Sequence, residues 1–212
     1  MKEKDPLNVI VTGVGGQGNV LVSQFMGRAL VRAGYHVTIG ETYGASQRGG
    51  AVMSHLRISR QAQYGPLIPS GQADVILGLE PVETLRVLAQ YGNPGVTVIT
   101  NSRPVYPLSV AIGAARYPTV EEITRALEEL SSSAWLINAT DIAVELGAPI
   151  LANIVMVGAL VGAGALPLGP EEFELEFQES LSGDRLELNL KAFRRGLAEA
   201  KARLRQSGSA SG

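Results

Sequence analysis

The hexapeptide GVGGQG at residues 13–18 restricts the fold of this chain more than any other stretch. It follows the apolar run NVIVT and precedes NVLVSQFMGRALVRAG, in which apolar residues recur at helical spacing. A short β-branched run that ends in glycine predicts a buried strand, and the patterned stretch predicts a helix over residues 19–33. The segment HVTIGE at 36–41 predicts a second strand. The chain therefore opens with a strand, a glycine turn, a helix and a strand, which is a βαβ unit.

The remaining segments continue the alternation of strands and helices. Further strands are expected at AVMSHLRIS (51–59), ADVILGLE (73–80), GVTVITN (95–101) and AWLINA (134–139). A helix is expected over 81–91, and another after Thr119, which forms a capping box with Glu122. A long apolar helix that begins at Pro149 is expected over 149–168, and charged amphipathic helices are expected within 170–206. This order predicts an α/β fold, a three-layer α/β/α Rossmann-like sandwich with a mostly parallel sheet and C-terminal helices. We expect a single domain over 1–206, with a helical part at 170–206, and a flexible tail over 207–212.

Charge and cysteine content exclude several classes of function. The formal net charge is −2, and no basic block supports a nucleic-acid partner. The chain has no cysteine, which excludes thiolate zinc sites, a cysteine nucleophile and cysteine-ligated iron–sulfur clusters within it. The N-terminal stretch lacks a signal-peptide pattern, and the apolar stretch 149–168 is glycine-rich without basic flanks. We therefore expect a cytoplasmic protein with no membrane span.

The glycine turn by itself allows more than one function. Gly13, Gly15 and Gly18 satisfy the spacing G-x-G-x-x-G, and backbone N–H groups at a helix start favour anions. Glu41 ends the second strand, where a dinucleotide-binding fold places its ribose-binding acid. One hypothesis is therefore a free-standing Rossmann oxidoreductase that binds NAD(P) or FAD. The alternatives are glycines that only relieve crowding between helix and sheet, and a ligand-free assembly module.

Three segments of the sequence together favour a different class of protein. GVGGQG, ETYGASQRGG and VMSHLRIS resemble the gamma-type component of the 2-oxoacid:ferredoxin oxidoreductases, and the likeness is greatest to the indolepyruvate members of that family. LANIVMVGAL and NLKAFRRG resemble later segments of the same family. The resemblance extends over residues 8–200 and is most specific in the first 60 residues.

The resemblance implies an accessory (beta/gamma) subunit that is not a self-sufficient enzyme. Such a complex decarboxylates a 2-oxoacid oxidatively, here indolepyruvate or another aryl pyruvate, to an acyl-CoA and passes electrons to ferredoxin. Thiamine diphosphate, Mg²⁺ and [4Fe-4S] clusters are expected on a large partner subunit, coenzyme A is a co-substrate of the complex, and this chain alone binds no cofactor or metal. The expected partners are that subunit and, through the complex, ferredoxin, with a homodimer as an option for the isolated chain. No residue of this chain is assigned a catalytic role.

A loop that contacts a ligand or a partner is expected at the glycine turn and after the second strand. Its residues are Gly13, Gly15, Gly16, Gln17, Gly18, Glu41, Arg48, Gly49 and Gly50. Arg48 can offer a planar donor fork to a carboxylate or phosphate, or it can pair with Glu41. Gly49 and Gly50 either admit a partner's backbone or form a plain turn. Gln17 bonds either to a ligand or neighbouring subunit, or to its own turn.

Secondary candidates lie further along the chain, at His55, Arg57, Asn153 and Asn189. His55 and Arg57 share one face of a strand, and a lone histidine there is more typical of a hydrogen-bonded structural residue than of an acid or base. Asn153 and Asn189 each fix packing or contact a ligand. Glycines in the apolar helix, at 158, 162 and 164, form a small-residue surface, which we expect to be a subunit interface rather than core packing.

Overall fold

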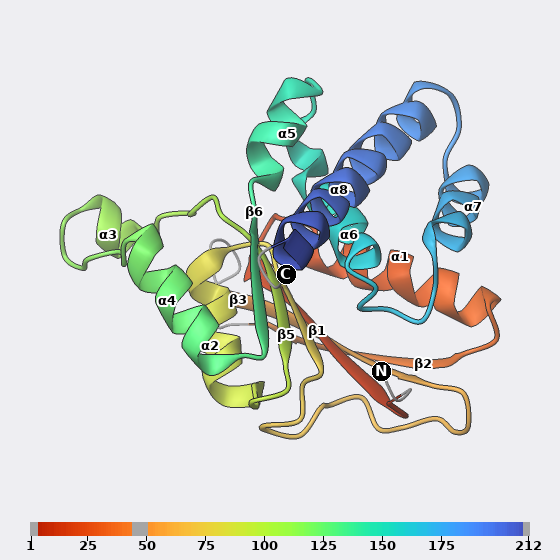
Figure 1. The fold of residues 1–212 in the computed structure, drawn as a ribbon, viewed down its shortest axis with the longest axis horizontal. Coiled ribbons are helices and arrows are strands. Elements are labelled where there is room, and N and C mark those ends of the chain that lie inside the picture. The colour runs from red at the N-terminus through yellow and green to blue at the C-terminus, as the bar shows by residue number, and fades with distance from the viewer. Residues whose placement is uncertain (1–3, 44–50, 210–212) are drawn as a thin grey trace.

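A six-stranded sheet forms the middle layer of the molecule, and helices cover both of its faces (Figure 1). The computed structural model describes residues 4–43 and 51–209. Its strands are β1 (Leu7–Val14), β2 (His36–Tyr43), β3 (Ala51–Ser59), β4 (Val75–Gly78), β5 (Thr97–Asn101) and β6 (Ser133–Ile137). Across the sheet the order is β2-β3-β1-β4-β5-β6. The predicted α/β sandwich with a mostly parallel sheet is therefore confirmed.

The predicted strand at 51–59, β3, lies inside the opening βαβ unit, a position that the sequence pattern does not reveal. β1, β4, β5 and β6 pair in parallel, whereas β3 is antiparallel to both of its neighbours, β1 and β2. Tyr43 pairs with Val52, so β3 returns directly alongside β2 and takes the position next to β1. β1 and β2 therefore run in the same direction without touching, although helix α1 (Asn19–Arg32) connects them.

The helices form two outer layers around two apolar cores. α2 (Pro81–Tyr91) and α4 (Val120–Leu130) cover one face of the sheet. The other face carries α1, α5 (Ala139–Glu145), α6 (Ala152–Gly162), α7 (Pro170–Ser180) and α8 (Gly183–Ser209). Alternate strand residues supply the two cores, because neighbouring side chains in a strand point to opposite faces: Ile10 belongs to one and Val9 to the other. The predicted capping box of Thr119 and Glu122 is present at the start of α4.

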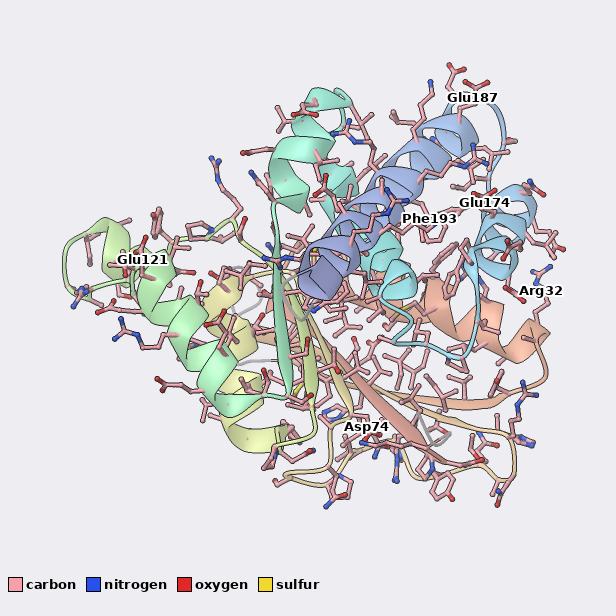
Figure 2. The ribbon with its side chains drawn as sticks, in the orientation of Figure 1. Arg32, Asp74, Glu121, Glu174, Glu187 and Phe193 are labelled. Atoms are coloured by element: carbon pink, nitrogen blue, oxygen red, sulfur yellow. The ribbon has the colours of Figure 1, made fainter. Side chains whose placement is uncertain are left out.

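The apolar helix is shorter than predicted, and its glycines have a different role. A 3₁₀ turn over Pro149–Leu151 precedes α6, which ends at Gly162. A Cβ atom on Gly158 would lie 2.0 Å from the main-chain oxygen of Phe193, and one on Gly196 would lie 2.0 Å from that of Val155. α6 and α8 therefore touch backbone to backbone. Phe193 lies on α8 (Figure 2), and its ring contacts those of Phe173 and Phe177 of α7. The expected subunit interface is wrong at Gly158 and Gly162, because α8 of the same chain already covers them. Gly164 lies past the end of α6, and a Cβ there would meet nothing within 4 Å.

Two helices, α3 (Leu108–Ala111) and α5, have no counterpart in the sequence prediction. At the C-terminal end, α8 continues to Ser209, three residues past the expected limit at 206, and residues 210–212 lie outside the described ranges. Within residues 4–43 and 51–209, no helix combines the length and the apolar character needed to cross a membrane.

Candidate functional site

The glycine turn joins β1 to α1 at the edge of the sheet where the parallel strands have their carboxyl ends. Gly16 and Gly18 have φ values of 97° and 86°, and Gly18 caps α1. The side chain of Gln17 closes this turn: its Oε1 accepts a 2.9 Å hydrogen bond from the Val14 N–H, and its Nε2 donates at 3.1 Å to the Leu79 oxygen. Gln17 therefore bonds within its own turn and to the end of β4, which is the second of its two interpretations.

Asn153 connects the first turn of α6 to the same glycine turn. Its Nδ2 donates a 3.1 Å hydrogen bond to the main-chain oxygen of Gln17, and a Cβ atom on Gly18 would lie 2.4 Å from that nitrogen. On the other side of the turn, Asn19 Nδ2 donates at 2.9 Å to the oxygen of Val52. Both asparagines are buried, so side-chain amides lock the turn from two directions. Asn153 therefore fixes the packing of α6 against the glycine turn, which is one of its two interpretations.

The position of Glu41 does not reproduce a dinucleotide-binding fold. Glu41 pairs with Ser54 of β3, and Ser54 pairs with Val11 of β1. Two strand spacings, each about 4.8 Å, therefore separate Glu41 from β1. In dinucleotide-binding domains the acid ends the strand directly beside the glycine-turn strand. The G-x-G-x-x-G spacing is thus present here without the strand order that makes it a dinucleotide site.

A cavity of about 430 Å³ lies beside the glycine turn. Gly16, Gln17 and Asn153 form one side of it, and Arg103 and Val105, from the segment after β5, form another. The helix after β1 covers one face of the sheet and the helix after β4 covers the other, so the cavity lies at a topological switch point. In open α/β sheets, ligands bind outside the carboxyl ends of strands at such points. Three of the predicted site residues therefore meet at one cavity.

A buried carboxylate fixes the segment that carries Arg103 and Val105. Glu80, 1% exposed, caps α2 by accepting a 2.8 Å hydrogen bond from the Glu83 N–H. It also accepts hydrogen bonds from the Val105 N–H, at 3.4 Å, and from the Tyr117 hydroxyl. Burial and the hydrogen bond to Glu80 raise the pKa of Tyr117 far above its ordinary value. The sequence prediction missed Glu80, although Pro81 at the first helical position marks the preceding residue as the N-cap.

The other predicted site residues divide into two groups. Arg48, Gly49 and Gly50 lie outside the described residues. Gly15 is half-buried in the turn. Gly13 leaves room for the Gln17 side chain, since a Cβ on Gly13 would lie 2.5 Å from Gln17 Oε1. The remaining three engage in local packing. His55 is fully buried and accepts a 3.3 Å hydrogen bond from the Ile68 N–H.

Arg57 and Asn189 also have local partners. Arg57 Nε donates to Asn8 Oδ1 at 3.1 Å, and its guanidinium lies 4.8 Å from the ring centroid of Tyr64. Asn189 Nδ2 donates at 2.8 Å to the oxygen of Arg185, one turn earlier on α8. Neither residue lines the cavity at the glycine turn, and nor does His55. The part of the chain that the structure describes contains no group of three or more metal-binding side chains.

The fold defines a class of protein, the subunits of 2-oxoacid oxidoreductases. The gamma subunit of a keto/oxoacid ferredoxin oxidoreductase from Geobacter sulfurreducens superposes with a TM-score of 0.65 at 25% identity, over 92% of this chain and 98% of that one. The 2-oxoglutarate:ferredoxin oxidoreductase of Magnetococcus marinus gives a TM-score of 0.72 at 24% identity, over 94% of this chain and 32% of that longer chain. This second likeness concerns the fold alone.

The sequence assigns the chain to a family within this class. Residues 8–199 match the pyruvate ferredoxin/flavodoxin oxidoreductase family, and the chain belongs to that family. The indolepyruvate oxidoreductase subunit IorB of Archaeoglobus fulgidus is 41% identical over 194 residues, which are 92% of this chain and 95% of that protein. IorB of Pyrococcus horikoshii is 40% identical over 198 residues, 93% of this chain and 97% of that protein. The resemblance seen in the sequence motifs is confirmed.

Proposed function

We propose that this chain is the accessory subunit of a thiamine-dependent 2-oxoacid:ferredoxin oxidoreductase of the indolepyruvate type. The observation that carries the proposal is the end-to-end match to two proteins named as indolepyruvate oxidoreductase subunits, at 41% and 40% identity. In this proposal the complex converts an aryl 2-oxoacid and coenzyme A to an acyl-CoA and carbon dioxide, and its electrons pass to ferredoxin. The aryl substrate follows from the names of those relatives.

The residues of this chain support the assignment of the cofactors to a larger partner subunit. The chain does not fit an iron–sulfur cluster, because it contains no cysteine to supply the thiolate ligands. We therefore assign the clusters to the partner subunit, together with thiamine diphosphate and Mg²⁺. The cofactors supply the carbanion and electron-transfer chemistry when bound there. This chain contributes a rigid edge that shapes and covers part of the complex.

The proposed contact surface is the carboxyl edge of the sheet. β1 and β2 run in the same direction, so the glycine turn after β1 and the connection after Tyr43 leave the sheet at the same edge. Val14 pairs with Ala51, which brings the start of β3 to that edge as well. Residues 13–18 and the connection that contains Arg48, Gly49 and Gly50 are therefore assigned to contact with the partner or with coenzyme A.

Co-purification from the native host tests this proposal. A tagged full-length chain is expected to recover, in near-equal amounts, a larger subunit that contains thiamine diphosphate and iron. Gly16→Trp adds a bulky side chain at the proposed edge, where a Cβ would meet nothing within 4 Å, and should reduce recovery of the partner. Gly34→Trp is the matched control: its φ of 85° and its open surroundings are similar, but it follows the other end of α1.

Two results would contradict the proposal. One is recovery of the tagged chain with no larger cofactor-bearing subunit. The other is micromolar binding of NAD or FAD by the isolated chain in calorimetry, which would favour a free-standing dehydrogenase or flavoprotein instead.

A further inference from the structure

The cavity beside the glycine turn is lined by residues of the turn, of the segment after β5 and of the start of α6. Its volume of about 430 Å³ is in the range of small-molecule sites, roughly 300–1,000 Å³. It opens at the carboxyl edge, where Arg103 and Ile150 remain largely exposed. A small molecule in solvent can therefore reach it.

Arg103 supplies the charge of this cavity. Among the described residues that line it, Arg103 is the one ionised side chain, and no carboxylate is part of the lining. Its guanidinium Nη1 lies 3.5 Å from Asp141 Oδ1, with side chains that are 61% and 54% exposed. Such exposed pairs contribute little free energy, so an anion competes easily for the guanidinium. A planar donor fork of this kind matches the two oxygens of a carboxylate.

Apolar side chains form most of the remaining wall. Val105, Pro149 and Ile150 contribute exposed aliphatic surface, whereas Leu79 and Met156 line the cavity but are themselves buried. Ile150 is 66% exposed. A ligand that covered it would remove that surface from water, which is favourable in proportion to the buried area. The wall therefore suits a compact apolar body next to a single negative charge.

The two sides of the cavity are held in place before any ligand binds. On one side, the Val105 N–H donates to the buried carboxylate of Glu80 at 3.4 Å, and Asn101 Nδ2 donates to Thr140 Oγ1 at 2.9 Å. On the other side, Asn153 is bonded to the glycine turn. Because these walls are already ordered, a ligand loses little free energy to ordering them.

We propose that this cavity binds a small organic monocarboxylate with a compact apolar body. The carboxylate lies on Arg103, and the body packs against Val105, Pro149 and Ile150. The proposal concerns the isolated chain. It is therefore tested separately from the proposed function.

Isothermal titration of the full-length chain tests the ligand class. Indole-3-acetate is the probe, because it joins a planar apolar ring to one carboxylate. 3-Methylindole has the ring without the carboxylate, and acetate has the carboxylate without the ring. We expect saturable binding of indole-3-acetate, and binding of the other two weaker by about tenfold or more, since a charged hydrogen bond or a buried ring is worth at least one decade in affinity.

Variants at exposed positions locate the site. Arg103→Gln removes the charge and Ile150→Trp fills the mouth, and we expect each to weaken indole-3-acetate binding by about tenfold or more. Arg116→Gln is the matched control, because Arg116 is an exposed arginine of the same segment that pairs with Glu122 and does not line the cavity. It should leave the affinity unchanged. Thermal melting verifies that all three variants fold.

Three results would overturn the proposal. They are the absence of saturable indole-3-acetate binding at millimolar concentration, binding that is the same in Arg103→Gln and the native chain, and binding of coenzyme A at this cavity without any carboxylate binding. Each of these leaves co-purification with a larger subunit unaffected, so failure of the ligand site and failure of the proposed function are distinguishable.

Discussion

The side chain of Asn153 and the main chain of Gln17, 136 positions apart in the sequence, are joined by a 3.1 Å hydrogen bond. This contact holds the start of α6 against the glycine turn. It exists because Gly18 has no side chain, since a Cβ there would lie 2.4 Å from the Asn153 nitrogen. The spacing of the glycines suggested a nucleotide site. At Gly18 it is explained by the close contact between α6 and the glycine turn.

Gly18→Ala should be more damaging than Gly16→Ala. Both glycines have φ in the left-handed region, where a non-glycine residue costs about 1–2 kcal/mol. Gly18→Ala also displaces the Asn153 amide, whereas the space beside Gly16 is open. We expect urea denaturation to show an additional loss of about 1–2 kcal/mol for Gly18→Ala, the value of a buried hydrogen bond. Equal free energies of unfolding for the two variants would contradict this role of Asn153.

Gly158→Ala should destabilise the chain through the contact of α6 with α8. An added methyl group would meet the Phe193 oxygen and force the two helices apart, which costs about 1–3 kcal/mol or more in a well-packed core. Gly65→Ala, where a Cβ would meet nothing within 4 Å, is the control and should be close to neutral. If Gly158→Ala instead changes the oligomeric state in light scattering and leaves the free energy of unfolding unchanged, the assignment of this surface to intramolecular packing is wrong.

Several elements could be predicted from the sequence because their signals are local. The strand at 51–59 shows in the alternation of its residues, and the capping box of Thr119 and Glu122 depends on residues three positions apart. Strand order is not local. Nothing in the alternation of β3 indicates that it lies between β1 and β2, and that position is what separates Glu41 from the glycine turn.

The site was harder to predict for the same reason. Gln17 and Asn153 were recognised as candidates, but their partners, Leu79 and the turn itself, become neighbours only through the sheet order. Glu80 was missed because its donors Val105 and Tyr117 come from a segment with no strong periodicity. The glycines of α6 carried a correct signal of close approach, but sequence could not distinguish α8 of the same chain from another subunit.

His55 should make the chain less stable as the pH falls below about 6.5, the ordinary histidine value. Burial lowers the pKa of His55 in the folded protein, so the unfolded chain takes up a proton first and stability is lost as the pH falls through this window. His55→Asn retains an acceptor for the Ile68 N–H without titrating. Urea denaturation between pH 7.5 and 5.5, a range of about one unit on either side of 6.5, should show a flatter dependence for this variant.

Two features make this comparison specific. Burial raises the pKa of Glu83, which stabilises the folded state as the pH falls and so acts against His55, but equally in both proteins. His36→Asn is the matched control substitution, because it replaces the other histidine, which is exposed. A flattened curve for His36→Asn, or an unchanged one for His55→Asn, would contradict the prediction.

Glu176 should be the most important carboxylate for joining α7 to α1. It is fully buried and accepts hydrogen bonds from Arg28 Nε at 2.6 Å and Arg32 Nη2 at 2.9 Å. Arg32 lies at the end of α1 beside α7 (Figure 2). Glu176→Gln should cost about 2 kcal/mol, below the range for fully buried pairs because both arginines are partly exposed.

Glu174→Gln is the matched control for Glu176. Glu174 also pairs with an arginine, Arg194, at 2.7 Å, but that pair is more exposed and should contribute less than about 1 kcal/mol. Both variants are compared by chemical denaturation at neutral pH. Equal losses of unfolding free energy in the two variants would show that burial does not determine how much these ion pairs contribute to stability.

The dependence of this chain on a larger subunit is tested most directly by reconstitution. Reduction of ferredoxin or a viologen dye is measured with indolepyruvate and coenzyme A for the purified chain, for the purified large subunit, and for their mixture. We predict that the chain alone gives no turnover and that the mixture restores the full rate, with saturation near equal stoichiometry. Turnover by the chain alone, or a large subunit whose rate is unchanged by adding the chain, would contradict its role as an accessory subunit.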